Sequence, residues 1–187
     1  MNTNEHQAQL AYELVGTRAT ANTVIQSLSG LLGFPFNLGV DVAVIPTIYG
    51  PMLNDLRRLY GHPETPDGTV GTLVPQIIKE LLADMVFDKF MGSIPIAGAY
   101  FNAICAKTLT WRLGILFAML SSRGPDIPSE AVGEAVTLIR ECFPQGDMFS
   151  FTTPDRSTFI TLVTSVQAVS ETDFQRKVNS ALAAIQS

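Results

Sequence analysis

Residues 96–121 read IAGAYFNAICAKTLTWRLGILFAMLS, and this stretch decides the fold. Only two of its side chains carry a charge, Lys107 and Arg112. Its large apolar residues occur on nearly every side of a helix drawn over this range: Ile96, Tyr100, Phe101, Ile104, Leu109, Trp111, Leu113, Leu116, Phe117 and Leu120. A helix that is apolar all round lies either in the centre of a bundle or in lipid. The stretch therefore predicts a helix enclosed by other helices or by a bilayer.

The composition of the whole chain shows the same shortage of charge. Of the 187 residues, 47% are apolar and only 16% are charged, whereas an average globular domain has about a quarter of its residues charged. A chain of this length buries a core large enough to fold without disulfides or a metal. Strand signals are poor and helical periodicity is good, so we expect an all-α bundle of about six or seven helices.

Prolines and glycines divide the first two thirds of the chain into two broken apolar hairpins. Helices are expected at about 5–32, 38–60, 76–90 and 96–121, which places the hairpins at about 20–60 and 76–122. Pro46 is expected to remove a backbone hydrogen bond from the second helix or to kink its axis, and Pro51 to kink or restart it. The segment GHPETPDG at 61–68 is expected to be a loop.

The character of the sequence changes after the linker SSRGPDIPS at 121–129. We therefore divide the chain into an apolar helical-hairpin module, residues 1–124, and a C-terminal helical cap or docking segment, residues 125–187. A helix at about 129–142 is expected to turn Val132, Val136 and Ile139 inward. A further helix is expected to have Pro154 in its first turn, and a last one to open on a capping box formed by Ser170 and Asp173.

Charge and cysteine usage exclude several classes of function. The net charge is −5 and no basic cluster is larger than the pair Arg57–Arg58, which excludes nucleic acid as a partner and argues against a polybasic membrane tether. Two cysteines, Cys105 and Cys142, have neither disulfide nor metal spacing, and no secretory signal opens the sequence. We expect a cytoplasmic protein, with the inner face of a membrane as the open alternative.

No motif in the sequence predicts catalysis. The phosphate loop G-x-x-x-x-G-K-[ST] and the nucleophile elbow G-x-S-x-G do not occur. His6 and His62 are the only histidines, and His62 beside Glu64 is too small a set for a metal site. We therefore expect a protein that is not an enzyme and that has no cofactor and no metal.

Three ionisable residues lie in the apolar stretches: Asp41, Lys107 and Arg112. A charge among apolar residues is costly unless it is paired, so Asp41 and Lys107 are candidates for an ion pair in a buried polar seam. The alternative is that all three lie on exposed strips, where the stems of Lys107 and Arg112 lie along the apolar surface.

A second group of polar residues ends the helix expected at 38–60: Asp55, Arg57, Arg58 and Tyr60. Arginine near a helix C-terminus is favoured by the helix dipole, which explains Arg57 and Arg58 without any function. The alternative interpretation is that these four residues dock a partner.

Two segments, MLNDLRRLYG at 52–61 and IPIAGAYFNAICAKTLTWRLG at 94–114, resemble a known family. This is the domain of unknown function 697, the YcjF-like family found fused to, or beside, bacterial GTPases. The first block of the resemblance is carried by Pro35, Asp41, Met52, Leu56, Tyr60 and Gly61, and the second by Pro95, Gly98, Asn102, Thr110 and Gly114. The resemblance implies a helical, membrane-associated module that works with a separate GTPase, and it implies no catalytic residue.

Two functions are compatible with these patterns. The first is a non-enzymatic helical module that associates with membrane lipid or with a protein partner such as a GTPase. The second is a soluble helical bundle that binds an apolar ligand or a partner's helix, including a role as a secretion-system effector or immunity protein. Self-association into a homo-oligomer is open in both.

Overall fold

The computed structural model describes residues 3–31, 45–81, 95–124 and 153–167, with the single positions 136, 138, 139, 170, 172, 173 and 176. The regular elements of this part are all α-helices: α1 (Thr3–Leu31), α3 (Ile45–Leu59), α4 (Asp67–Leu81), α5 (Pro95–Arg123) and α7 (Arg156–Ser165). The predicted all-α class is confirmed for these residues. The total of six or seven helices and the two broken hairpins stay predictions.

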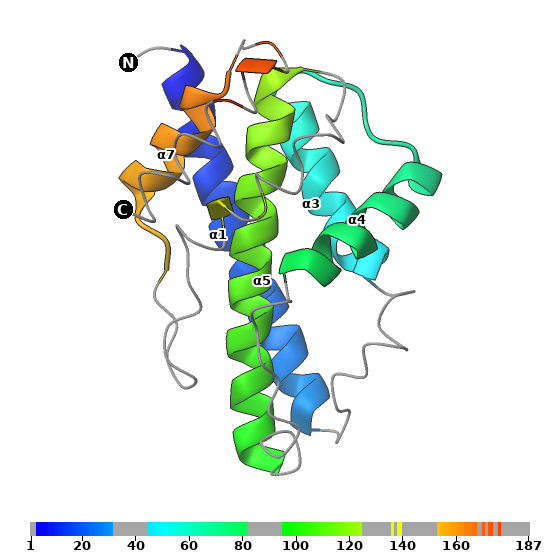
Figure 1. Ribbon diagram of the computed structural model, residues 1–187. Helices are drawn as coiled ribbons and strands as arrows, with labels where there is room; N and C mark the ends of the chain where they lie inside the picture. Colours follow the sequence, from blue (N-terminus) through cyan, green and yellow to red (C-terminus); the bar gives the residue numbers. More distant parts are fainter. Residues whose placement is uncertain are drawn as a thin grey trace.

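Two long helices form the centre of the molecule. Helices α1 and α5 run antiparallel side by side, and α7 packs on both (Figure 1). On the other side, α3 packs on α1 and α5, and α4 packs on α3 and α5. Helix α5 is therefore in contact with each of the other four helices.

The second half of the most apolar stretch is buried inside this bundle. Every residue of α5 from 108 to 121 is buried, which is what a helix without a polar face requires. For these residues, the centre of a bundle is the one observed of the two predicted surroundings. In the part of the chain that the structure describes, no helix has the length and apolarity needed to cross a bilayer.

Small residues bring α1 and α5 close together. Ala8, Ala11, Val15 and Ala19 recur every three or four residues along α1, and all four are fully buried. Opposite them, Gly114 of α5 has no side chain, and a Cβ built there would lie 2.3 Å from Cγ1 of Val15. The two backbones can approach this closely only because position 114 is glycine.

Helix α7 closes the core through an aromatic cluster. Phe159 of α7, Tyr12 of α1 and Trp111 of α5 have ring centroids 4.9 to 6.3 Å apart, distances at which aromatic rings attract one another. The hydroxyl of Tyr12 donates to the carbonyl oxygen of Pro154 at 3.0 Å. These contacts join residues of the two predicted parts, 1–124 and 125–187, in one hydrophobic core.

Three prolines lie in other positions of the helices than predicted. Pro46 is the second residue of α3, where no intrahelical partner for an N–H is required, so it need neither cost the helix a hydrogen bond nor kink it, contrary to the prediction. Helix α3 continues through Pro51 without a restart. Pro154 precedes the N-cap residue Asp155 and is not in the first turn of α7, because the Asp155 carboxylate accepts from the Thr158 N–H.

Helix α4 begins at Asp67, nine residues before the predicted start at 76, so residues 67 and 68 of the expected loop are helical. Its inward residues include Ile77, Ile78 and Leu81, which are buried as predicted. Residues 38–44 and 82–94 lie outside the described chain, as does Val132. Val136 and Ile139 are buried as expected, and the Asp173 N–H donates to the Ser170 hydroxyl at 3.2 Å, as in a capping box.

The substitution Gly114→Ala tests the close approach of α1 and α5. We expect it to lower the free energy of unfolding by about 1–3 kcal/mol, because overpacking against Val15 outweighs the better helix propensity of alanine. Gly16→Ala is the matched control, since a Cβ at position 16 would lie 3.4 Å from the Trp111 ring, an ordinary contact. Urea unfolding measures both, and equal stabilities of the two variants would contradict the packing described.

Candidate functional site

Thr110 is the centre of a buried polar layer that joins three helices. Its hydroxyl accepts from Nδ2 of Asn22 at 3.1 Å and donates to the carbonyl oxygen of Ala106 at 2.7 Å. Tyr49 of α3 shares a side-chain hydrogen bond with the same hydroxyl, and burial raises the pKa of Tyr49 to about 12. A buried polar group is costly unless it is hydrogen-bonded, so this layer holds α1, α3 and α5 in one register.

Arg112 joins α5 to the end of α4. It is fully buried, and Nη1 donates to the carbonyl oxygen of Leu81, the last residue of α4, at 3.0 Å. A buried guanidinium is costly unless its N–H groups find acceptors, and the Leu81 carbonyl oxygen is one such acceptor. The alternative that Arg112 lies on an exposed strip is therefore wrong, because the chain uses its guanidinium inside the bundle.

The remaining members of the predicted seam are placed only in part. Lys107 is half-buried on α5, directly before the buried stretch that begins at residue 108. Asp41 lies outside the described residues, so the ion pair between Asp41 and Lys107 stays a prediction.

The predicted docking residues divide between the interior and the surface. Arg57 is only 4% exposed, and its Nε donates to the carbonyl oxygen of Pro63 at 2.7 Å. The hydroxyl of Tyr60 is buried without a hydrogen-bond partner in the described chain, and burial raises its pKa. Asp55 and Tyr60 are half-buried and Arg58 is exposed, and the Asp55 carboxylate lies 2.7 Å from the Arg58 guanidinium. Of the four predicted docking residues, Arg57 is the buried one, and the other three keep part of their surface exposed.

A tight turn after α3 positions the neighbouring surface. Gly61 has a φ of +78°, its N–H donates to the Arg58 carbonyl, and the His62 N–H donates to the Arg57 carbonyl. This is the Schellman arrangement, for which glycine is the preferred residue because of its positive φ. The chain turns back along α3, where the Thr65 N–H donates to Oδ1 of Asn54 at 2.8 Å. The turn therefore leads directly into α4 beside the first half of α3.

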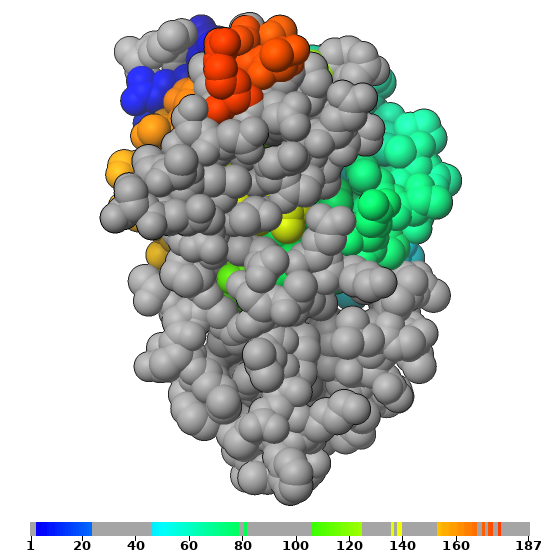
Figure 2. Space-filling view, viewed as in Figure 1, coloured from blue at the N-terminus to red at the C-terminus, as the bar shows by residue number. Residues whose placement is uncertain are grey.

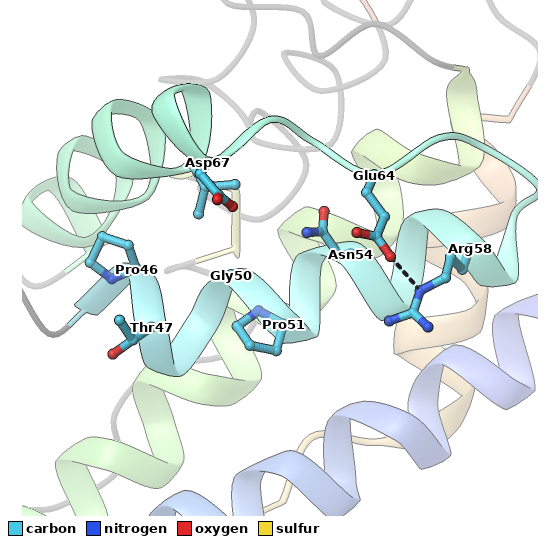
Figure 3. A pocket seen from close by; sticks show the side chains of 9 residues that line it. Pro46, Thr47, Gly50, Pro51, Asn54, Arg58, Glu64 and Asp67 are labelled. Carbon is cyan, nitrogen blue, oxygen red and sulfur yellow. Dashed lines mark ion pairs between the residues drawn. The ribbon is translucent and has the colours of Figure 1, made fainter.

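A groove of about 480 Å³ lies between α3, this turn and the start of α4 (Figure 3). One side is lined by residues of α3: Pro46, Thr47, Gly50, Pro51, Asn54 and Arg58. The other side is lined by Glu64, Asp67 and Val70. Arg58 Nε lies 3.3 Å from Oε1 of Glu64, and in the view of Figure 3 Asn54 lies between this pair and Asp67. The groove has an apolar floor and polar groups at its rim.

Most residues of the groove were not predicted as functional. Asp67 was assigned to a loop, although Val70, Val74, Ile77, Ile78 and Leu81 have helical spacing. Gly68, Gly71 and Pro75 argue against a helix over these residues, because glycine and proline are the residues least favoured in helices. An acidic residue directly after Pro66 is a helix-start signal that would have placed Asp67 in a first turn.

The described residues show no site with an obvious chemistry. No three side chains of His, Cys, Asp or Glu among them are placed to hold a metal ion. Comparisons with protein-family models, with curated proteins and with solved structures give no match. The resemblance to the YcjF-like family therefore stays a prediction, and the groove is the candidate site that the geometry supports best.

The pair Thr110→Val and Thr108→Val tests the polar layer. Thr110→Val leaves Nδ2 of Asn22 without its acceptor inside the bundle, and we expect a loss of about 1–3 kcal/mol in the free energy of unfolding. Thr108 has the same residue type and is also buried, but its hydroxyl has no hydrogen-bond partner among the described residues. Thr108→Val should leave stability unchanged or raise it. If Thr110→Val proved the more stable of the two in urea, the role given to Thr110 would be wrong.

Tyr49 makes stability fall at high pH. The pKa of Tyr49 is raised to about 12 in the folded chain, against about 10 for tyrosine in an unfolded one. Between these values the folded chain binds the proton more strongly, so stability present below pH 10 is lost as pH rises, by roughly 1 kcal/mol per pH unit.

Tyr49→Phe removes this titration. The unfolding free energy of the wild type minus that of the variant should therefore fall as pH rises from 9 to 11.5. Denaturation followed at a series of pH values measures it. Because Tyr60 is present in both proteins, its own titration cancels in the difference. Parallel pH profiles of the two proteins would show that Tyr49 is not buried as described.

Proposed function

We propose that the chain is a non-enzymatic helical module that binds a protein partner on the surface formed by α3 and α4. The observation that supports this proposal is the composition of that surface. Within residues 67–78 of α4, the exposed positions hold Asp67, Gly68, Thr69, Gly71, Thr72 and Gln76, at the surface seen in Figure 2. Solvent-facing helix positions are usually filled by strong helix formers such as lysine, glutamate and alanine.

The two glycines of α4 have no packing role within the described chain. A Cβ built at Gly68 or Gly71 would meet nothing within 4 Å. Each glycine weakens a helix by roughly 0.5–1 kcal/mol relative to alanine. A surface that keeps these residues at that cost is suited to close approach by another backbone.

Burial of α5 favours a protein over a membrane as the partner. The apolar residues of α5 from Leu109 to Leu120 are in the core, so this part of the helix does not need a bilayer to cover it. The family resemblance adds the partner class that it implies, a separate GTPase. The groove beside α4 is a concave element of the same surface.

A photo-crosslinking residue placed on this surface tests the proposal in cells. Thr47 of α3 is exposed in the groove lining, and Thr161 of α7 is an exposed threonine on another helix. We expect p-benzoylphenylalanine at position 47, but not at position 161, to form one defined protein adduct in the native host, identified by mass spectrometry. Identical products at both positions, or no adduct from position 47, would refute the proposed surface. Lipid adducts from position 47 would instead support a membrane as the partner.

A further inference from the structure

We propose that the groove between α3 and α4 binds a basic segment of the partner, with an arginine or lysine side chain directed to Asp67. This inference rests on the proposed function, because it names the chemistry that the same surface recognises. Three features of the groove support it: one carboxylate without a counter-charge, one amide fixed to donate, and an apolar floor between them.

The ionisable side chains that line the groove are Arg58, Glu64 and Asp67, which sum to one negative charge. Arg18 of α1 pairs with Asp55, Asp55 also pairs with Arg58, and Arg58 pairs with Glu64. These two cations and two anions sum to zero. Asp67 is exposed on the rim, and within the described chain it has neither an ion pair nor a hydrogen bond through its carboxylate. The local charge that a ligand meets in the groove is therefore negative, as is the net charge of the whole chain, −5.

Asn54 is oriented so that its amide group can donate. Its Oδ1 accepts from the Thr65 N–H at 2.8 Å, which assigns the oxygen to the turn and leaves Nδ2 on the other side. Nδ2 makes no hydrogen bond in the described chain, and Asn54 lines the groove. A peptide carbonyl is the acceptor that such a donor would take from an extended segment.

The floor of the groove fits the hydrocarbon stem of a long basic side chain. Gly50 and Val70 are the buried residues of the lining and form this floor, and a Cβ at Gly50 would lie 2.9 Å from Cγ1 of Val70, so a larger residue at position 50 would force Val70 to shift. Arginine and lysine bury an apolar stem while the charged group stays in contact with water or a partner. A basic side chain whose stem lies on this floor would have its cationic end at Asp67. The backbone of the same bound segment would then lie beside the amide of Asn54.

A pair of probes that differ only in charge tests the inference on the full chain. N-acetylarginine amide carries the guanidinium, and N-acetylcitrulline amide is its neutral counterpart of nearly the same shape. We expect the arginine probe to shift backbone amide signals of the groove in ¹⁵N-resolved NMR spectra, saturably, and to bind roughly threefold to tenfold more tightly than the citrulline probe. N-acetylleucine amide serves as the apolar probe.

Two variants assign the difference to one carboxylate. Asp67→Asn should reduce the preference for arginine over citrulline to about onefold. Glu5→Gln removes an exposed acidic residue from the first turn of α1, outside the groove, and should leave the preference unchanged. Circular dichroism of both variants checks that the helices are intact, and a preference that survives Asp67→Asn in a folded protein would overturn the inference.

The remaining outcomes also decide against the inference. Equal shifts from arginine and citrulline, or the strongest shifts from leucine, would assign the groove to an uncharged segment. Groove signals that move with protein concentration alone would assign it to a second copy of the chain. No groove shift with any probe would remove the site. Because the crosslinking at position 47 does not depend on charge, an adduct there together with a negative probe result would refute only the basic ligand and leave the proposed function standing.

Discussion

Val15 of α1 lies against the bare Cα of Gly114 in α5, and the rest of the structure depends on this contact. It sets how closely the two longest described helices approach. Dispersion attraction falls steeply with separation, so two long helices in close contact gain much more than two helices held apart by a side chain. With α1 and α5 fixed in this way, α3 and α7 each rest on both of them. One glycine therefore determines the geometry of a four-helix contact.

Polar groups inside the bundle then select one arrangement among those that the apolar residues would allow. Leucine, isoleucine and phenylalanine tolerate sliding of one helix along another, because hydrophobic attraction has no direction. The hydroxyl of Thr110 and the guanidinium of Arg112 do not, because each is satisfied at one set of positions only. A shift of α1 by one turn would separate Asn22 from Thr110. Thr110 and Arg112 thus fix the position of α5 along α1 and α4. Valine or methionine at the same positions would be buried but would not fix this position.

The centre of the fold could be predicted from the sequence, and the site could not. The range of α5 follows from an apolar run with almost no charge, and its central position follows because such a helix needs cover. The predicted start of α4 at residue 76 is wrong. Gly68, Gly71 and Pro75 have low helix propensity, but the packing of α4 on its neighbours outweighs this local preference. Arg57 next to Arg58 looks like one basic pair, yet a turn at Gly61 buries the first and leaves the second outside. The groove depends on that turn bringing Asp67 beside α3, and no local pattern encodes the distance between residues that meet in this way.

The aromatic cluster under α7 has a practical consequence. Trp111 is the single tryptophan of the chain, and it lies where α1, α5 and α7 meet, in contact with Tyr12 and Phe159. Indole emission shifts to longer wavelength when water reaches the ring. The tryptophan fluorescence of this protein therefore depends on the solvent exposure of Trp111 alone. Undocking of α7 would remove Phe159 from the ring of Trp111, even with α1 and α5 still paired. The emission wavelength of Trp111 can therefore be used to follow whether α7 is docked on α1 and α5.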